Sequence, residues 1–228
     1  MNKRQYQKEL DKILQGLESR KEPEPVPTLF LHSCCAPCSS YVLEYLGIWF
    51  EITVFYYNPN ISFSPEYQMR VREQKRLIEI YNKEGNRHPI KMMESDYVPQ
   101  EFFKEVKGLE TQPEGAARCN ACFGLRLRET ARIAAAEGYD YFATTLTISP
   151  VKNAGRINQI GGQMAAIYGV PWLPSDFKKK NGYKRSVELS EKYGLYRQDY
   201  CGCVFSRRES QIPRSNGNKE IDNRREKG

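Results

Sequence analysis

The sequence predicts an α/β protein built on a doubly wound, mainly parallel sheet. Short β-rich apolar runs alternate with helical patterns between residues 28 and 174, which is typical of parallel strands joined by crossover helices. A cysteine-rich motif directly follows the first of these runs, where the ligand-binding loop of such a sheet lies. The 228 residues suit one domain with appendages rather than two full domains.

Five short segments predict strands, because they are apolar or alternate in hydropathy and contain many β-branched and aromatic residues. They are TLFLHS (28–33), EITVFYYN (51–58), HPIKMM (88–93), YDYFATTLT (139–147) and VPWLP (170–174). Pro59 ends the second strand. HPIKMM has the weakest pattern of the five.

Four longer segments between these strands predict helices. They are SSYVLEYLGIW (39–49), residues 65–85, RLRETARIAAAEG (126–138) and INQIGGQMAAIYG (157–169). Pro65 suits the first turn of its helix, and Gly85 and Gly138 are stop signals. Two internal glycines weaken the pattern of the last helix.

We place the domain at residues 28–206, and its C-terminal end is a basic segment that contains the last two cysteines. Two flanking segments are distinct from this domain. Residues 1–27 predict an amphipathic helix followed by a stiff EPEPVP linker. The helix carries Leu10, Ile13, Leu14 and Leu17 at helical spacing. Residues 207–228 are basic and lack periodicity, so we expect a disordered tail.

Composition limits the classes of function. Lys and Arg exceed Asp and Glu by 35 − 28 = 7, which favours polyanionic partners such as nucleic acid. No apolar run approaches the ~18 residues of a membrane span, and the charged N-terminus does not resemble a secretory signal. We therefore expect a cytoplasmic protein. Structural disulfides are rare in that compartment, so its seven cysteines point to metal or redox chemistry.

The cysteines form three groups, CCAPC (34–38), CNAC (119–122) and CGC (201–203). The first group follows a strand and the second opens a helix, where the helix dipole stabilises thiolates. Four thiolates from these two groups can close a tetrahedral metal site or an iron–sulfur site. A structural zinc site remains the alternative, although adjacent Cys34 and Cys35 suit zinc poorly because neighbouring side chains diverge in extended backbone.

The third group predicts a reversible dithiol. A disulfide between Cys201 and Cys203 closes a small, strained ring that is readily reduced, and Gly202 gives the turn its freedom. Two free thiols or further metal ligands are the alternative. The usual phosphate-binding motifs for ATP and for dinucleotides are missing, and neither His32 nor His88 has a histidine nearby in the sequence.

With these motifs in view, the chain resembles the epoxyqueuosine reductases of the QueH type over roughly residues 28–208. The resemblance rests on LHSCCAPCSS, YNPNI followed by PEY, RCNACFGLRL, TTLTISPVKN, DFKKKNGYKRS and YRQDYCGCVFS, in that order. It implies a HUP-like fold related to the PP-loop ATPases, but without their nucleotide loop.

The resemblance also implies cofactors and residue roles. It assigns Cys34, Cys35, Cys119 and Cys122 to a 4Fe–4S cluster. It makes Cys201 and Cys203 a redox-active pair that forms a disulfide, and it suggests Cys38 as a ligand of an additional mononuclear iron. The implied enzyme is a cobalamin-independent oxidoreductase that reduces epoxyqueuosine to queuosine at the wobble position of tRNAs of the Asp, Asn, His and Tyr type. Its electrons come from a donor that remains unidentified.

Other residues near these motifs are candidates by proximity. The departing oxygen needs a proton donor, for which Tyr200, Asp199 and Tyr183 are candidates, and Asn58 and Asn60 are candidate substrate contacts or turn caps. A basic segment with an interleaved aromatic residue predicts tRNA binding, with a solvated basic loop as the alternative. It contains Lys178, Lys179, Lys180, Tyr183, Lys184 and Arg185.

Two rival functions remain open from the sequence. One is an iron–sulfur tRNA thiolation enzyme, which would need the ATP loop that this sequence lacks. The other is a non-enzymatic RNA-binding module whose loops are held together by zinc.

Overall fold

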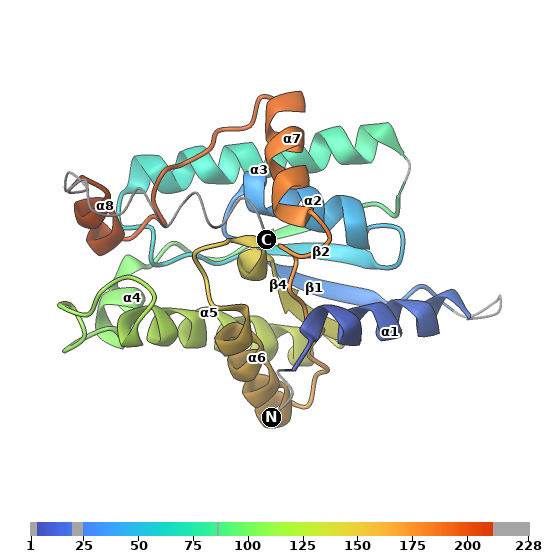
Figure 1. The fold of residues 1–228 in the computed structure, drawn as a ribbon, viewed down its shortest axis with the longest axis horizontal. Helices are drawn as coiled ribbons and strands as arrows, with labels where there is room; N and C mark the ends of the chain where they lie inside the picture. Colours follow the sequence, from blue (N-terminus) through green and yellow to red (C-terminus); the bar gives the residue numbers. More distant parts are fainter. Residues whose placement is uncertain (1–3, 20–24, 86, 212–228) are drawn as a thin grey trace.

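The computed structural model describes residues 4–19, 25–85 and 87–211. Four parallel strands form one sheet in the order β3-β2-β1-β4 (Figure 1). They are β1 (Thr28–His32), β2 (Glu51–Tyr56), β3 (Lys91–Glu94) and β4 (Tyr141–Thr144). In the register of the sheet, Leu31 of β1 lies between Val54 of β2 and Ala143 of β4. The strand order therefore reverses beside β1, and ligands of such sheets bind at this switch point, at the carboxyl ends of the strands.

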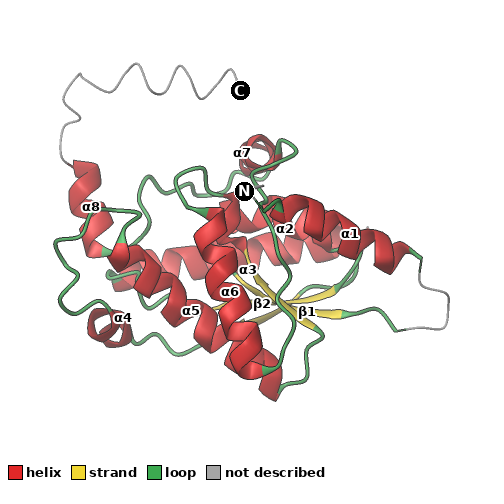
Figure 2. Cartoon of the chain, turned by 60° about the horizontal axis from the view of Figure 1, so that its bottom comes forward, coloured by secondary structure: helices red, strands yellow, loops and turns green. Residues whose placement is uncertain are grey.

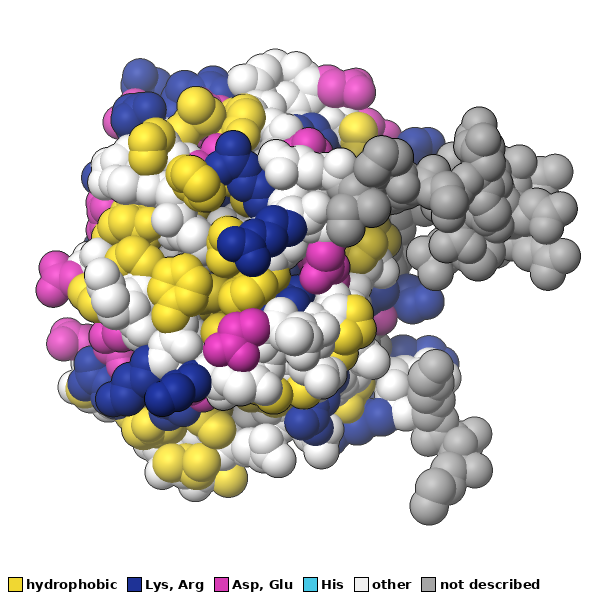
Figure 3. Space-filling view, turned by 90° about the vertical axis from the view of Figure 1, so that its left-hand side faces the viewer, with side chains coloured by type: hydrophobic (Ala, Val, Ile, Leu, Met, Phe, Trp, Pro, Cys, Tyr) yellow, Lys and Arg dark blue, Asp and Glu magenta, His cyan; other side chains and the backbone are white. Residues whose placement is uncertain are grey.

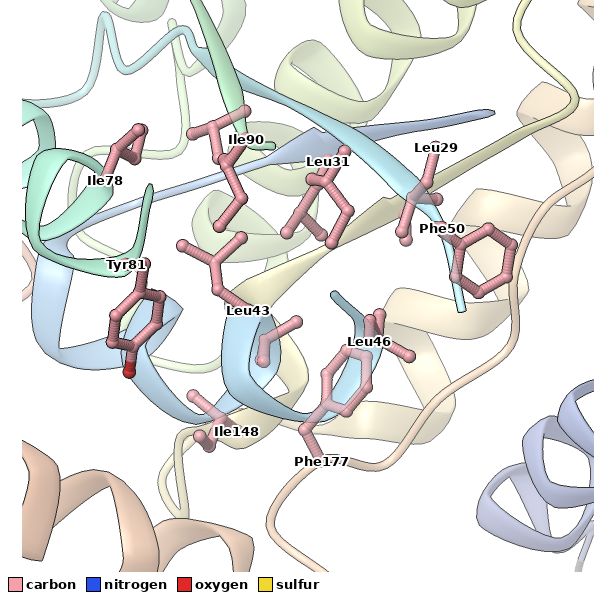
Figure 4. Close-up of a cluster of buried hydrophobic side chains, with 14 of the residues drawn as sticks. Leu29, Leu31, Leu43, Leu46, Phe50, Ile78, Tyr81, Ile90, Ile148 and Phe177 are labelled. Atoms are coloured by element: carbon pink, nitrogen blue, oxygen red, sulfur yellow. The ribbon is translucent and has the colours of Figure 1, made fainter. Parts of the chain in front are cut away.

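Helices cover one face of the sheet through a continuous apolar core. They are α1 (Tyr6–Glu18), α2 (Ala36–Leu46) and α3 (Ser64–Glu84), and α7 (Gly182–Lys192) packs on α2. Leu29 and Leu31 of β1 meet Leu43 and Leu46 of α2 in this core (Figure 4). Because side chains alternate along a strand, the residue between the two leucines faces the opposite side.

That opposite side carries a second, more aromatic core under another set of helices. They are α4 (Pro99–Glu105), α5 (Ala117–Ala136) and α6 (Ala154–Tyr168). Phe30 of β1 stacks on Phe55 of β2, with 4.8 Å between the ring centroids. The sheet is thus enclosed between two helical layers (Figure 2), as expected for a doubly wound fold.

The structure confirms the predicted α/β class and four of the five predicted strands. The fifth prediction, a strand at 170–174, was wrong: only one parallel bridge joins Phe142 to Trp172, because the chain leaves the sheet at the adjacent prolines. The helix predicted at 126–138 begins earlier, at Ala117. Helices α4 and α7 were not predicted.

The ends of the chain also differ from expectation. The N-terminal helix is shorter than residues 1–21, but Leu10 and Leu14 are buried against the core as its spacing predicts. The prediction of disorder from residue 207 was wrong for its first residues, because α8 (Val204–Gln211) is a helix whose Phe205 contacts Phe102 of α4. Residues 212–228 lie outside the described part of the chain. None of the described helices is both long and apolar enough to cross a bilayer.

Candidate active site

The first cysteine group lies directly beyond β1, at the switch point of the sheet. Cys35 is extended at the start of α2, and Cys38 lies in the first turn of that helix. The three sulfur atoms of Cys34, Cys35 and Cys38 all lie within 4.8 Å of one another, so these thiols could hold a metal ion. The backbone N–H of Cys34 donates to Oγ1 of Thr145, which follows β4. The loops after the two strands that flank the switch point therefore meet here.

Charge is distributed unevenly over these three thiols. Hydrogen bonds from Cys35 and Cys38, aided by the positive charge of Lys152, hold the pKa of Cys34 well below that of an ordinary thiol, although burial acts in the other direction. The pKa values of Cys35 and Cys38 are raised because each donates to the Cys34 sulfur and is buried beside its charge. One sulfur of the group is thus the preferred thiolate, which is the form that binds metal.

The second group lies near the start of α5. Burial raises the pKa of Cys122 to about 12, and it also raises the pKa of Cys119, even though the Gly115 N–H donates to the Cys119 sulfur at 3.1 Å. At this helix terminus the thiols are therefore not the lowered-pKa thiolates that the sequence suggested. Cys34 and Cys119 pack against one apolar cluster between α5 and α6, but among the described residues only the first group has three sulfur atoms within metal-binding distance of one another.

The third group forms a tight turn before α8. Gly202 has φ +113°, and a Cβ at this position would lie 2.9 Å from Cγ1 of Ile61, so both conformation and space require glycine. Arg70, buried and paired with Glu66, donates to the Cys201 carbonyl at 3.2 Å and fixes the turn from α3. Cys201 and Cys203 are free thiols, and burial raises the pKa of Cys203 to about 11.

Two adjoining cavities connect the three groups. We call outer cleft the cavity of about 570 Å³ whose wall includes Cys34, Cys38 and Cys201, and inner pocket the narrower cavity lined by Cys119, Cys122, Cys201 and Cys203. Six of the seven cysteines therefore line one connected space. The seventh, Cys35, lies behind Cys34 and accepts a hydrogen bond from Gln198.

Two cations in this space were missed by the sequence analysis. Lys152 follows β4 and lines both cavities, whereas Arg126 is 1% exposed, one turn beyond Cys122, and lines the inner pocket. Among the described residues, no carboxylate lies within 4.0 Å of either cation, and Nη2 of Arg126 has no hydrogen-bond partner. Burial opposes their charge, but the neighbouring thiols more than offset it and raise the pKa of both cations.

Comparison with known proteins identifies the family to which this arrangement belongs. A family model described as epoxyqueuosine reductase QueH matches residues 29–209. The chain belongs to the epoxyqueuosine reductase QueH family. It is 47% identical over 198 residues to the epoxyqueuosine reductase QueH of Streptococcus pyogenes, covering 86% of this chain and 77% of that protein.

More distant QueH proteins span the same part of the chain. The QueH protein of Staphylococcus epidermidis is 43% identical over 213 residues, covering 92% of this chain and 89% of that protein. The QueH protein of Thermotoga maritima is 35% identical over 198 residues, covering 83% of this chain and 98% of that protein. The match therefore extends well beyond the cysteine motifs.

The residues proposed from sequence as proton donors all lie at the outer cleft. Tyr183, Asp199 and Tyr200 line it together with Cys201. Burial raises the pKa of Tyr200, whose ring lies against the Arg70 guanidinium. Asn58 and Asn60 are both buried, and they lie in different places. Asn60 lines the inner pocket. Asn58 donates to the carbonyl of Ser33, so it supports the cysteine loop.

The predicted basic segment is less concentrated in charge than its sequence suggests. Lys178 pairs with Asp176, Lys180 with Asp11, and Arg185 with Glu44 and Glu188. Tyr183, 40% exposed, is the member of the segment that lines the outer cleft. On the side of the molecule where α8 lies, Lys and Arg side chains are interspersed with apolar ones (Figure 3).

His32 is a structural residue of this QueH protein. It is fully buried at the end of β1, and Nε2 lies 3.2 Å from the carbonyl oxygen of Tyr57. Since a carbonyl only accepts, Nε2 carries the proton and Nδ1 accepts from the hydroxyl of Thr144 at 2.8 Å. Both ring nitrogens are therefore satisfied without a ligand.

Proposed function

We propose that the protein is an epoxyqueuosine reductase, which removes the epoxide oxygen of epoxyqueuosine at the tRNA wobble position without cobalamin. The observation that carries this proposal is the convergence of six cysteines on two connected cavities at the switch point of the sheet. The names of the QueH relatives support the same reaction. A location in the cytoplasm fits a protein whose thiols must stay reduced.

Oxidation of the Cys201–Cys203 dithiol supplies the electrons and protons that the reaction consumes. Converting an epoxide to an alkene breaks both C–O bonds, forms a C=C double bond and consumes two electrons and two protons, with release of water. Oxidation of Cys201 and Cys203 to a disulfide releases two electrons and two protons. The raised pKa of Cys203 keeps its thiol protonated at neutral pH, so the proton is available. Tyr200 and Asp199, which line the cleft beside Cys201, are candidates to relay the protons.

The remaining cysteines suit an iron–sulfur centre. Cys34, Cys35, Cys119 and Cys122 would hold a 4Fe–4S cluster, since such clusters take four thiolates, and Cys38 would contribute to a mononuclear iron site. The unpartnered Nη2 of Arg126 fits an anionic group in the inner pocket. When bound, the cluster would supply one-electron transfer between the external donor and the active site.

The outer cleft would take the modified nucleotide of tRNA. Its volume of about 570 Å³ is in the range of small-molecule sites. Tyr183 at its rim offers a ring on which an unpaired base could stack. The basic segment and the net charge of +7 favour the phosphate backbone. We propose tRNAs of the Asp, Asn, His and Tyr type as substrates, and a separate electron donor that reduces the disulfide again.

One experiment tests this proposal against its rivals. Anaerobically purified protein is incubated with epoxyqueuosine-containing tRNA and a chemical reductant, and the nucleosides are then analysed. We expect queuosine to appear as epoxyqueuosine disappears, from a brown, iron-containing protein. A thiolated nucleoside would instead indicate a thiolation enzyme. Colourless, zinc-containing protein that binds tRNA without changing it would indicate a structural module, because d¹⁰ zinc has no such chromophore.

A further inference from the structure

Lys152 is held at the junction of the two cavities by a short, well-anchored loop. It follows β4 and the 3₁₀ turn η1 (Thr145–Ile148). Its backbone N–H donates to the carbonyl of Ser149 at 3.2 Å. The next residue, Asn153, caps α6 by accepting from the N–H of Arg156 at 3.0 Å. Because the backbone of Lys152 and the side chain of Asn153 are both hydrogen-bonded, the loop fixes the position from which the Lys152 side chain leaves the backbone.

Lys152 is the one cation, among the described residues, that lines both the outer cleft and the inner pocket. The other cations of the outer cleft are engaged: Arg70 with Glu66 and two carbonyls, and Arg197 with Ser190. Within the described residues, no hydrogen-bond acceptor is paired with the Lys152 ammonium group. Its three N–H donors are thus available to a ligand.

Cys201 is the one cysteine that lines both cavities, so the junction combines a redox thiol with an available ammonium group. On the proposed function, the epoxide must reach this thiol, and the charge that develops as the C–O bonds break lies on the epoxide oxygen. Preorganised donors aimed at such a developing charge contribute strongly to catalysis in sites that exclude water.

We propose that Lys152 is a further catalytic residue, whose ammonium group donates a hydrogen bond to the epoxide oxygen while the C–O bonds break. This inference rests on the proposed function. In the step, the two C–O bonds break, the C=C bond and the Cys201–Cys203 disulfide form, and the two thiol protons pass to the oxygen, which leaves as water. Lys152 stays charged throughout, so its role needs no co-reactant beyond the dithiol.

The test compares three variants in the full-length, iron-loaded protein: Lys152→Met, Lys152→Arg, and, as a matched control, Lys83→Met at an exposed lysine in the last turn of α3. Single-turnover reduction of epoxyqueuosine tRNA gives the rate constant at saturation and the half-saturation concentration. Iron content and the number of alkylatable thiols are measured on the same samples. Removing one such donor typically lowers the rate 10²–10³-fold.

We expect Lys152→Met to lower the rate constant at saturation roughly 100-fold. The half-saturation concentration, the iron content and the number of alkylatable thiols should stay unchanged. Lys152→Arg should recover much of the rate, and Lys83→Met should match the parent. The inference fails if Lys152→Met turns over normally. It also fails if only the half-saturation concentration rises, since the lysine would then bind RNA, or if the variant loses iron, since the lysine would then support the metal site. An inactive parent protein would instead refute the proposed function.

Discussion

The side-chain amide of Gln198 donates a hydrogen bond to the sulfur of Cys35, with 2.9 Å between the two heavy atoms. This contact joins the segment before the dithiol turn to the loop after β1, from positions 163 residues apart in the chain. Arg70 adds a second link, from α3 to the carbonyl of Cys201. The C-terminal segment is therefore an integral wall of the cysteine site.

Our first prediction concerns the proposed cluster ligands. Serine at position 34, 35, 119 or 122 should remove the brown chromophore and most of the bound iron, because a hydroxyl is a poor substitute for thiolate at iron. Visible spectra and iron analysis of anaerobically purified variants measure both. Full iron content in two of the four variants would refute this ligand assignment.

The positions of the first two cysteine groups at the edge of the sheet could be predicted because their signals are local. CCAPC directly follows an apolar strand and CNAC lies near the start of a helix, so the sheet topology alone brings Cys34 and Cys119 to one edge. The position of the third motif followed from family resemblance rather than from pattern. Its attachment depends on buried Arg70, which donates to the carbonyl of Cys201, 131 residues away, and no local pattern reveals such a contact.

Lys152 and helix α7 show two further limits of sequence reasoning. Lys152 lies in a loop without a distinctive pattern, and its importance comes from the cavities that meet around it. Helix α7 begins after Asn181, which has φ +61° and makes no capping hydrogen bond through its side chain. The usual N-cap signal is therefore missing, and the preceding lysines resemble a solvated loop.

A second prediction concerns the dithiol. Serine at position 201 or 203 should leave the brown chromophore intact but abolish most multiple turnover, because neither variant can form the intramolecular disulfide. Counting alkylatable thiols checks the pairing directly: the oxidised parent should show two fewer than the reduced parent, and each variant should show no such difference. Loss of the chromophore in either variant would make these cysteines metal ligands instead.

Tyr183 and the lysines around it lead to a third prediction. Lys179 and Lys184, for which no carboxylate partner lies within 4.0 Å among the described residues, should contact phosphate more readily than Lys178 and Lys180. Replacing Lys179 and Lys184 with glutamine should reduce the slope of log affinity against log salt concentration for tRNA binding by roughly two. The Lys178→Gln/Lys180→Gln double variant changes net charge equally and should have less effect. If both double variants reduce the salt dependence equally, only the net charge of the protein matters for tRNA binding.

A fourth prediction uses the neutral, buried His32. Burial, and then the positive charge of Arg126, lower its pKa to about 3, against roughly 6.5 in the unfolded chain. Between these values the unfolded state binds the extra proton, so this group destabilises the fold as pH falls below about 6.5, by up to roughly 4–5 kcal/mol near pH 3. His32→Gln should flatten that part of the stability–pH curve in denaturant titrations. His88→Gln, at the only other histidine, is the matched control for the loss of one imidazole.

The last prediction concerns Arg126, a buried charge without a carboxylate partner among the described residues. Holding a guanidinium away from water is unfavourable unless an anion compensates it. The neighbouring cysteines raise the pKa of Arg126 only as thiolates, and at neutral pH Cys122 is protonated because burial raises its pKa to about 12. In metal-free protein, Arg126→Met should therefore raise the free energy of unfolding by roughly 1–3 kcal/mol. In iron-loaded protein the proposed anionic cluster would supply the compensation, so the same variant should release iron to a chelator faster than the parent.

The distinctive result is that Arg126→Met stabilises the metal-free protein but weakens iron retention in the iron-loaded protein. A simple packing defect would weaken both. Arg126→Lys keeps the charge and should retain iron better than Arg126→Met. Arg128→Met, at an exposed arginine on the same helix that pairs with Glu105, is the matched control and should leave iron release unchanged. If Arg126→Met destabilises the metal-free protein and does not affect iron release, Arg126 only supports the packing of α5. If Arg126→Met stabilises the metal-free protein and speeds iron release, the buried charge of Arg126 is stabilised by the anionic cluster proposed for the inner pocket.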